Sequence, residues 1–219
     1  MTYDLVIFDF DGTLADTGEW FMSTTNRAAV QFGFRQMSPE QFQQLRSKGN
    51  REIIAHMGVP FWKLPKIAAF MREQASRHAA EIRLFPGVVD MLACVQSAGV
   101  RTAIVSSNRE AVVRTALAQH VRLIDHFACG ASLFGKARHF QKLLKATSQD
   151  PGRVIAIGDE ARDIEAARKA GIAAGSVAWG YAEADFLRSL RPDHFFATVD
   201  DIAAALFGGR GSGQAESAR

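Results

Sequence analysis

The stretch Leu5-Val6-Ile7-Phe8-Asp9-Phe10-Asp11-Gly12-Thr13-Leu14-Ala15-Asp16-Thr17 places two carboxylates directly after a run of β-favouring apolar residues. The apolar run predicts a buried strand, so we expect Asp9 and Asp11 at the carboxyl end of that strand. In open parallel α/β sheets, ligands bind at this edge. Buried carboxylates are unfavourable unless a cation or a proton accompanies them. The stretch therefore indicates a functional site at the end of the first strand.

Two simpler explanations of the same stretch fit less well. A tight turn capped by Asp and Gly would need no function, but it would not explain carboxylates at the end of an apolar strand. An EF-hand loop would need a third acidic ligand where the sequence has Thr13, and it would follow a helix rather than a strand.

Length and composition indicate a globular protein. The chain has 219 residues, 47% of them hydrophobic, which is enough for one large domain or one domain with an insert. No apolar run reaches about 18 residues, and the first residues lack the pattern of a secretory signal peptide. Cys94 and Cys129 have apolar neighbours and no metal-ligand spacing, so we predict two reduced core cysteines. A cytoplasmic location is expected on these grounds.

The charge pattern favours a small anionic substrate. Lys and Arg number 26 against 23 Asp and Glu, which gives a formal net charge of +3. The basic residues are scattered and do not alternate with aromatic residues, so neither nucleic acid nor a membrane is an expected partner. A mildly positive balance suits a phosphorylated or otherwise anionic small molecule.

Residues 16–83 read as helices separated by short breaks. A helical stripe from Phe21 ends at Gly33, and Ser38-Pro39 has the pattern of an N-cap followed by proline at the first helical position. A longer helix is expected from Ile67 toward Ile82. The sequence Phe85-Pro86-Gly87 marks the end of this all-helical region.

From residue 88 onward, helices and strands alternate. Strands are expected at 101–105, 125–129, 153–157 and 173–178, and helices at 88–98, after Asn108, at 136–146 and at 164–170. This alternation implies right-handed crossovers and a doubly wound parallel sheet. We therefore predict an α/β core of residues 1–15 and 84–207, a helical cap of residues 16–83 inserted into it, and a flexible tail of residues 208–219.

Polar residues follow three further elements of the predicted core. Ser106-Ser107-Asn108 stands where a helix begins, which suits an anion, although serine there can also be a simple N-cap. Asp159 and Asp163 are four residues apart, so both can face one point. Beside Asp9 they predict a site for a hard cation with oxygen ligands, whereas alone they would be ordinary charges at a helix start. Lys136, at the start of another helix, can neutralise carboxylate or phosphate.

These four motifs, taken in this order, resemble those of the haloacid dehalogenase superfamily of phosphotransferases. The resemblance covers about residues 3–205 and implies a Rossmann-like core, with the helical region in the place of the cap that many members carry. The stretch Asp159-Glu160-Ala161-Arg162-Asp163 through Gly171, with Trp179-Gly180 after the next strand, is similar to the phosphoglycolate-phosphatase-like branch. One departure is Ala137-Arg138 after Lys136, where many relatives have proline soon after the lysine.

The resemblance implies a role for each motif. Asp9 would be the nucleophile that forms a phosphoaspartate, and Asp11 the general acid and then the general base. Magnesium would be bound by the Asp9 carboxylate, the Asp11 backbone carbonyl and Asp159. Asp163 would join this metal site through a metal-bound water or would orient Lys136.

The resemblance also implies a phosphate site and a substrate-reading cap. Ser106, Ser107 and Lys136 would hold the phosphoryl oxygens, with Gly12 and Asn108 beside them. The loop from Ser47 to Glu52 would lie over the active site, and there Arg51 is a candidate for contacting the substrate beyond its phosphate. An exposed basic loop explains Arg51 equally well. Glu160 could belong to the metal site or stand at a solvated helix start, and we prefer the helix start. Trp179 and Tyr181 could line the cleft, but we prefer a packing role for both.

The leading functional hypothesis is a Mg²⁺-dependent phosphatase that hydrolyses a small-molecule phosphate monoester, such as phosphoglycolate, a sugar phosphate or a nucleotide. The alternative is a phosphomutase of the β-phosphoglucomutase type, which would need a cap that binds a second phosphate. Dehalogenase chemistry uses no magnesium and is disfavoured by Asp11, Asp159 and Asp163. A domain that binds phosphorylated ligands without turnover would be expected to have lost a catalytic carboxylate. This alternative is disfavoured because the sequence retains all of them. A monomer or a homodimer is expected.

Overall fold

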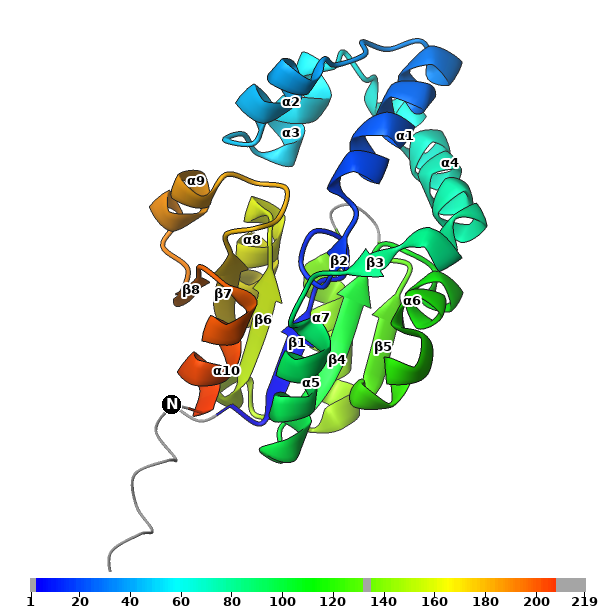
Figure 1. Cartoon of the computed structure of the whole chain (residues 1–219). Helices are drawn as coiled ribbons and strands as arrows, with labels where there is room; N and C mark the ends of the chain where they lie inside the picture. The colour runs from blue at the N-terminus through cyan, green and yellow to red at the C-terminus, as the bar shows by residue number, and fades with distance from the viewer. Residues whose placement is uncertain (1–2, 132–134, 208–219) are drawn as a thin grey trace, which may run out of the picture.

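The computed structural model describes residues 3–131 and 135–207. Its main sheet has six parallel strands in the order β5-β4-β1-β6-β7-β8 (Figure 1). The strands are β1 (Leu5–Phe8), β4 (Arg101–Ser106), β5 (His126–Cys129), β6 (Val154–Gly158), β7 (Ala173–Val177) and β8 (His194–Phe196). The predicted doubly wound α/β fold is confirmed, with β8 as a strand that the sequence pattern did not indicate.

The register of the central strands brings the predicted motifs together. Phe8 at the end of β1 pairs with Ile104 of β4 on one side and with Ile157 of β6 on the other. The residues that follow these three positions, including Asp9 and Asp159, therefore leave the sheet at the same edge. This edge is the carboxyl end of the strands, where parallel α/β sheets bind ligands.

Each face of the sheet has its own apolar core. Along β1, Leu5 and Ile7 belong to one buried cluster, and Val6 and Phe8 to the other, because successive side chains of a strand point to opposite faces. The face of Val6 is covered by α5 (Val88–Ser97), α6 (Glu110–Leu117) and α10 (Val199–Phe207). The opposite face is covered by α7 (Lys136–Thr147), α8 (Ala161–Ala170) and α9 (Ala184–Ser189).

Four helices lie above the carboxyl edge of the sheet and form what we call the helical insert (Figure 1). They are α1 (Gly18–Phe32), α2 (Pro39–Leu45), α3 (Asn50–His56) and α4 (Leu64–Arg77). The predicted N-cap of α2 is present, since the Ser38 hydroxyl accepts a hydrogen bond from the Gln41 backbone N–H at 3.3 Å. The structure also contains short 3-10 helices, labelled η1 (Phe61–Lys63), η2 (Ala79–Glu81), η3 (Ala118–Leu123) and η4 (Pro151–Arg153).

The insert is connected to the sheet through a small antiparallel pair, β2 (Ala15–Asp16) and β3 (Arg83–Leu84). Strands of two residues carry no periodic pattern, so the sequence did not indicate them. The domain boundaries near residues 15 and 83 stay a prediction, and the antiparallel pair spans both of them. The predicted tail, 208–219, lies outside the described residues.

One prediction about the cysteines is wrong. Both are free, but Cys94 is exposed on α5 and Cys129 is only partly buried at the end of β5. The core-facing stripe of α5 consists of Val88, Met91, Leu92 and Val95, and position 94 falls outside this helical stripe.

Within residues 3–131 and 135–207, none of the helices has the length and apolar character needed to span a bilayer.

Candidate active site

Lys136 lies between two buried carboxylates at the carboxyl edge of the sheet. Its Nζ is 2.6 Å from Asp9 Oδ2 and also forms an ion pair with Asp163 Oδ1. All three side chains are at most 7% exposed. Burial lowers the pKa of Lys136, but the nearby carboxylates of Asp163 and Asp9 outweigh it, and the net effect is a raised pKa. Lys136 therefore keeps its positive charge next to Asp9.

Asp9 belongs to a compact group of acidic residues. Asp9, Asp159, Glu160 and Asp163 each offer an oxygen, and these atoms lie within 4.8 Å of one another. Burial raises the pKa of Asp9, and the opposing charge of Lys136 does not outweigh it, so the net effect is a raised pKa. Burial, followed by repulsion from Glu160 and Asp9, raises the pKa of Asp159 well above its ordinary value.

This acidic group fits a hard divalent cation. Carboxylate oxygens are the ligands that such ions prefer, and a cation would offset both the burial and the mutual repulsion of the carboxylates. Asp159 is completely buried, and one of its oxygens accepts a hydrogen bond from Thr13 Oγ1 at 3.1 Å. The backbone N–H of Tyr181 donates to its other oxygen at 2.7 Å. These bonds fix the orientation of the carboxylate toward the acidic group.

Asp11 has a different environment from Asp9, although only one residue separates them. Its carboxylate accepts hydrogen bonds from Asn108 Nδ2 at 2.7 Å and from Thr17 Oγ1 at 3.2 Å. Both donors are neutral. Burial, followed by the nearby charge of Asp9, raises the pKa of Asp11 to about 7. At neutral pH, Asp11 can therefore both hold and release a proton.

The end of β4 contributes a second group of polar residues. Ser106 is completely buried, and its Oγ accepts a hydrogen bond from the Asn108 backbone N–H at 3.0 Å. A hydroxyl that accepts one hydrogen bond still has its own proton to donate. Ser107 and Asn108 line a cavity that opens above Asp11. The sequence-predicted residues Ser106, Ser107 and Asn108 are thus gathered beside Asp11.

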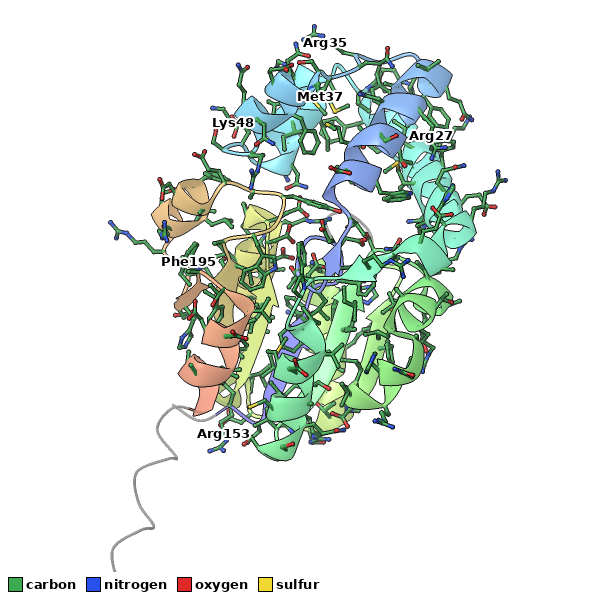
Figure 2. All side chains as sticks on the ribbon, viewed as in Figure 1. Arg27, Arg35, Met37, Lys48, Arg153 and Phe195 are labelled. Atoms are coloured by element: carbon green, nitrogen blue, oxygen red, sulfur yellow. The ribbon has the colours of Figure 1, made fainter. Side chains whose placement is uncertain are left out.

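Only part of the loop from Ser47 to Glu52, which was expected to contact the substrate, lines the cavity. Lys48 and Asn50 line the cavity, whereas Arg51 is exposed and is not among the lining residues. Figure 2 shows Lys48 and Met37 in the helical insert, far from Arg153 at the opposite end of the sheet. The predicted contact between Arg51 and the substrate stays a prediction.

The helix start preferred for Glu160 is wrong, and Arg162 had no predicted role. Glu160 is not a solvated helix start, because its side chain is only 13% exposed, pairs with Arg162 and accepts a hydrogen bond from Asn50 Nδ2 at 2.9 Å. The Arg162 side chain is 19% exposed and lies among the acidic residues. Burial lowers its pKa, but Glu160, Asp163 and the other carboxylates outweigh this and raise it. The spacing Glu160-x-Arg162 gave no signal, since residues two apart on a helix do not face each other.

Tyr181 also does more than the packing role that was expected for it. Its hydroxyl is 2.6 Å from Thr17 Oγ1, which in turn donates to Asp11, and its ring stacks on Phe21 of α1 at 5.0 Å between centroids. Trp179 donates from its indole N–H to the Thr13 backbone carbonyl at 3.0 Å. The segment after β7 therefore supports Asp11 and the residues around Asp159.

The insert is held to the core by hydrogen bonds across the cavity. Arg46 of the insert donates from Nε to the Tyr181 carbonyl at 3.0 Å and from Nη2 to the Gly180 carbonyl at 3.1 Å. The Arg46 carbonyl accepts a hydrogen bond from the Glu183 backbone N–H at 2.8 Å. Together with the bond from Asn50 to Glu160, these contacts close the insert over the acidic residues.

A Rossmann-like sheet with a lysine and buried carboxylates at its carboxyl edge, covered by a helical insert, defines a class of α/β hydrolases. Comparison with known proteins agrees with this class: the sequence model of the family of haloacid dehalogenase-like hydrolases matches residues 6–177. The chain belongs to this family. The predicted similarity to its phosphoglycolate-phosphatase-like branch is also confirmed.

Individual relatives span nearly the whole chain. Phosphoglycolate phosphatase of Synechococcus elongatus is 32% identical over 92% of this chain and 96% of its own length. Tyrosine-protein kinase PtkA of Mycobacterium tuberculosis is 31% identical over 92% of this chain and 72% of its own length. The crystal structure of a predicted phosphatase from Clostridium acetobutylicum superimposes with a TM-score of 0.79 at 16% identity, covering 95% of this chain and 100% of that one. This last likeness concerns the fold.

Proposed function

We propose that this protein is a Mg²⁺-dependent phosphatase that hydrolyses small-molecule phosphate monoesters through a phosphoaspartate on Asp9. The observation that carries the proposal is the contrast between Asp9 and Asp11. Asp9 is paired with Lys136 at 2.6 Å, which favours its ionised form, whereas Asp11 has neutral donors and a pKa of about 7. Two neighbouring carboxylates, one held by a buried cation and the other by neutral donors, can divide nucleophilic and acid–base work between them.

The proposed reaction has two steps. In the first, an Asp9 oxygen attacks phosphorus, the bond from phosphorus to the ester oxygen breaks, and Asp11 gives its proton to the departing alcohol. In the second, Asp11 takes a proton from water, the water oxygen attacks the phosphoaspartate, and phosphate leaves with Asp9 restored. Lys136 and the hydroxyl of Ser106 would hold the phosphoryl oxygens, as donors to negative charge.

Magnesium is part of this proposal. The carboxylates of Asp9 and Asp159 and the backbone carbonyl of Asp11 would hold the ion. Bound there, it would supply positive charge that offsets the charge of the phosphate and favours ionised carboxylates. Asp163 pairs with Lys136, which supports a role in orienting the lysine.

Phosphate release from a panel of phosphate esters tests the proposal. We expect turnover in Mg²⁺ that is lost in EDTA, and that falls to the background rate in Asp9→Asn because the nucleophile is gone. Asp90→Asn is the matched control, since Asp90 is exposed on α5, belongs neither to the acidic group nor to the cavity lining, and should keep wild-type activity. Turnover in Asp9→Asn equal to that of wild type would contradict the proposal.

The same assay separates the mutase alternative. Isomerisation of sugar phosphates that needs a bisphosphate activator, without net phosphate release, would favour a mutase. The expected cytoplasmic location and the monomeric or homodimeric state stay predictions.

A further inference from the structure

The cavity between the helical insert and the sheet has mainly apolar walls. Its volume is about 280 Å³, near the lower end of the range for small-molecule sites. Apolar side chains reach it from all four helices of the insert, among them Trp20, Phe21, Phe42, Ile53, Ile67 and Met71. The same cavity is lined by Asp11, Asn108 and Arg162 of the core. The apolar space is therefore continuous with the site of the proposed reaction.

The apolar residues of α2 and α3 face this cavity instead of packing into a closed core. Neither α2 nor α3 contains a fully buried residue, although both carry large apolar side chains. Phe42 of α2 and Ile53 and Ile54 of α3 instead line the cavity. Leaving such surface next to water is unfavourable by roughly 25 cal/mol per Å². A ligand with an apolar body would remove this cost.

The cations at the cavity are mostly engaged already. Arg46 donates to the carbonyls of Gly180 and Tyr181. Lys48 forms an ion pair with Glu52, with 3.6 Å between Nζ and Oε2. Arg162 pairs with Glu160. Among the described residues that line the cavity, Arg72 is the one cation whose side chain forms no hydrogen bond or ion pair. The cavity therefore has one cation, Arg72, that is left to receive a further negative charge, against a large apolar surface.

We propose that the ester's leaving group is a predominantly apolar alkyl or aryl body that fills this cavity, while its phosphate lies at Asp9. This inference rests on the proposed phosphatase function and adds the class of substrate to it. It departs from phosphoglycolate, after which several relatives are named and whose leaving group is a small charged acid.

A series of ethyl, butyl and hexyl phosphate tests the proposal directly. The three leaving alcohols are similar in acidity, so the chemical step changes little along the series. Burial of a methylene contributes about 0.8 kcal/mol, so kcat/KM should rise about fourfold for each methylene until the cavity is full. A flat series, or phosphoglycolate turned over faster than hexyl phosphate, would overturn the proposal. The latter result would instead indicate that Arg72 pairs with the carboxylate of a small acid.

A pair of variants on α4 locates the effect in the cavity. Ala68 lines the cavity, whereas Ala69, the next residue, is exposed and does not. We expect Ala68→Leu to lower the ratio of kcat/KM for hexyl over ethyl phosphate by about tenfold, because the added volume competes with the longer chain. Ala69→Leu adds the same side chain to the same helix and should leave the ratio unchanged. An equal ratio in both variants would contradict the assignment of the cavity.

Binding of alkylphosphonates separates this proposal from the phosphatase function itself. These compounds have a carbon–phosphorus bond that the proposed reaction does not break. Calorimetry on the wild-type protein should show a Kd that falls about fourfold per methylene from ethyl- to hexylphosphonate. If this holds while no ester is hydrolysed, the phosphatase function fails and the apolar site stands. If esters are hydrolysed but the phosphonate affinities do not change with length, the apolar site fails alone.

Discussion

Gly12 lies so close to Asp159 that position 12 has no room for a side chain. A Cβ at this position would overlap the Asp159 carboxylate, and the backbone has φ +75, which other residues rarely adopt. We predict that Gly12→Ala displaces Asp159 and sharply reduces phosphate release. Phosphate release and the free energy of unfolding, measured on the same preparation, check this prediction.

Gly99 provides the control for Gly12. It also has φ +75, but a Cβ there would meet nothing within 4 Å. Gly99→Ala should therefore show only the backbone strain, about 1–3 kcal/mol of stability, with turnover unchanged. If both variants lost activity to the same extent, contact with Asp159 would not explain the glycine at position 12.

The two cysteines should react at very different rates. Cys94 is exposed, whereas burial, followed by the charge of Glu110, raises the pKa of Cys129 to about 12. At pH 8 only about one in ten thousand Cys129 side chains would be the reactive thiolate. We predict one fast thiol in a titration with Ellman's reagent, absent in Cys94→Ser and retained in Cys129→Ser. Fast labelling that survives Cys94→Ser would contradict this prediction.

At the scale of elements, the strands that carry chemistry could be predicted closely from the sequence. Strands expected at 101–105 and 153–157 are observed as Arg101–Ser106 and Val154–Gly158. Continuous apolar runs followed by polar residues are a strong local signal, because central parallel strands are buried on both faces. The two-residue strands β2 and β3 and the three-residue β8 lack such a signal.

The sequence motifs predicted which residues belong to the site, but they did not predict the roles of Glu160 and Tyr181. Glu160 is oriented by Asn50, 110 positions earlier in the chain, and Tyr181 contacts Thr17, 164 positions away. No local pattern encodes such contacts, because they depend on how the insert closes over the sheet. The solvated helix start expected for Glu160 is wrong for this reason.

The packing of α5 against the sheet gives a prediction at the same scale. Leu92 is completely buried in the cluster that includes Val6 and Phe8. Leu92→Ala should lower the free energy of unfolding by about 2–5 kcal/mol, through lost apolar burial and the cavity left behind. Urea denaturation measures the change. Val30→Ala is the control, because Val30 is 71% exposed and its truncation should change stability by less than about 0.5 kcal/mol.

For the whole molecule, the contact between insert and core is tied to the acidic residues of the site. Asn50, the first residue of α3, donates to Glu160, which itself pairs with Arg162. Closure of the insert therefore orients a carboxylate next to Asp9 and Asp159. Opening of the insert would leave Glu160 without its neutral donor.

Asn50→Asp should weaken this closure. The new carboxylate would face Glu160, so repulsion would replace a hydrogen bond, while an acidic residue at the start of α3 would leave the helix itself stable. We predict that hydrogen exchange at the Glu183 backbone amide, which donates to the Arg46 carbonyl at 2.8 Å, becomes about tenfold faster. Gln44→Glu adds the same charge at an exposed position of α2 and should leave this exchange rate unchanged. Equal acceleration in both variants would indicate a general effect of charge on the insert, and unchanged exchange in Asn50→Asp would show that closure does not depend on the bond to Glu160.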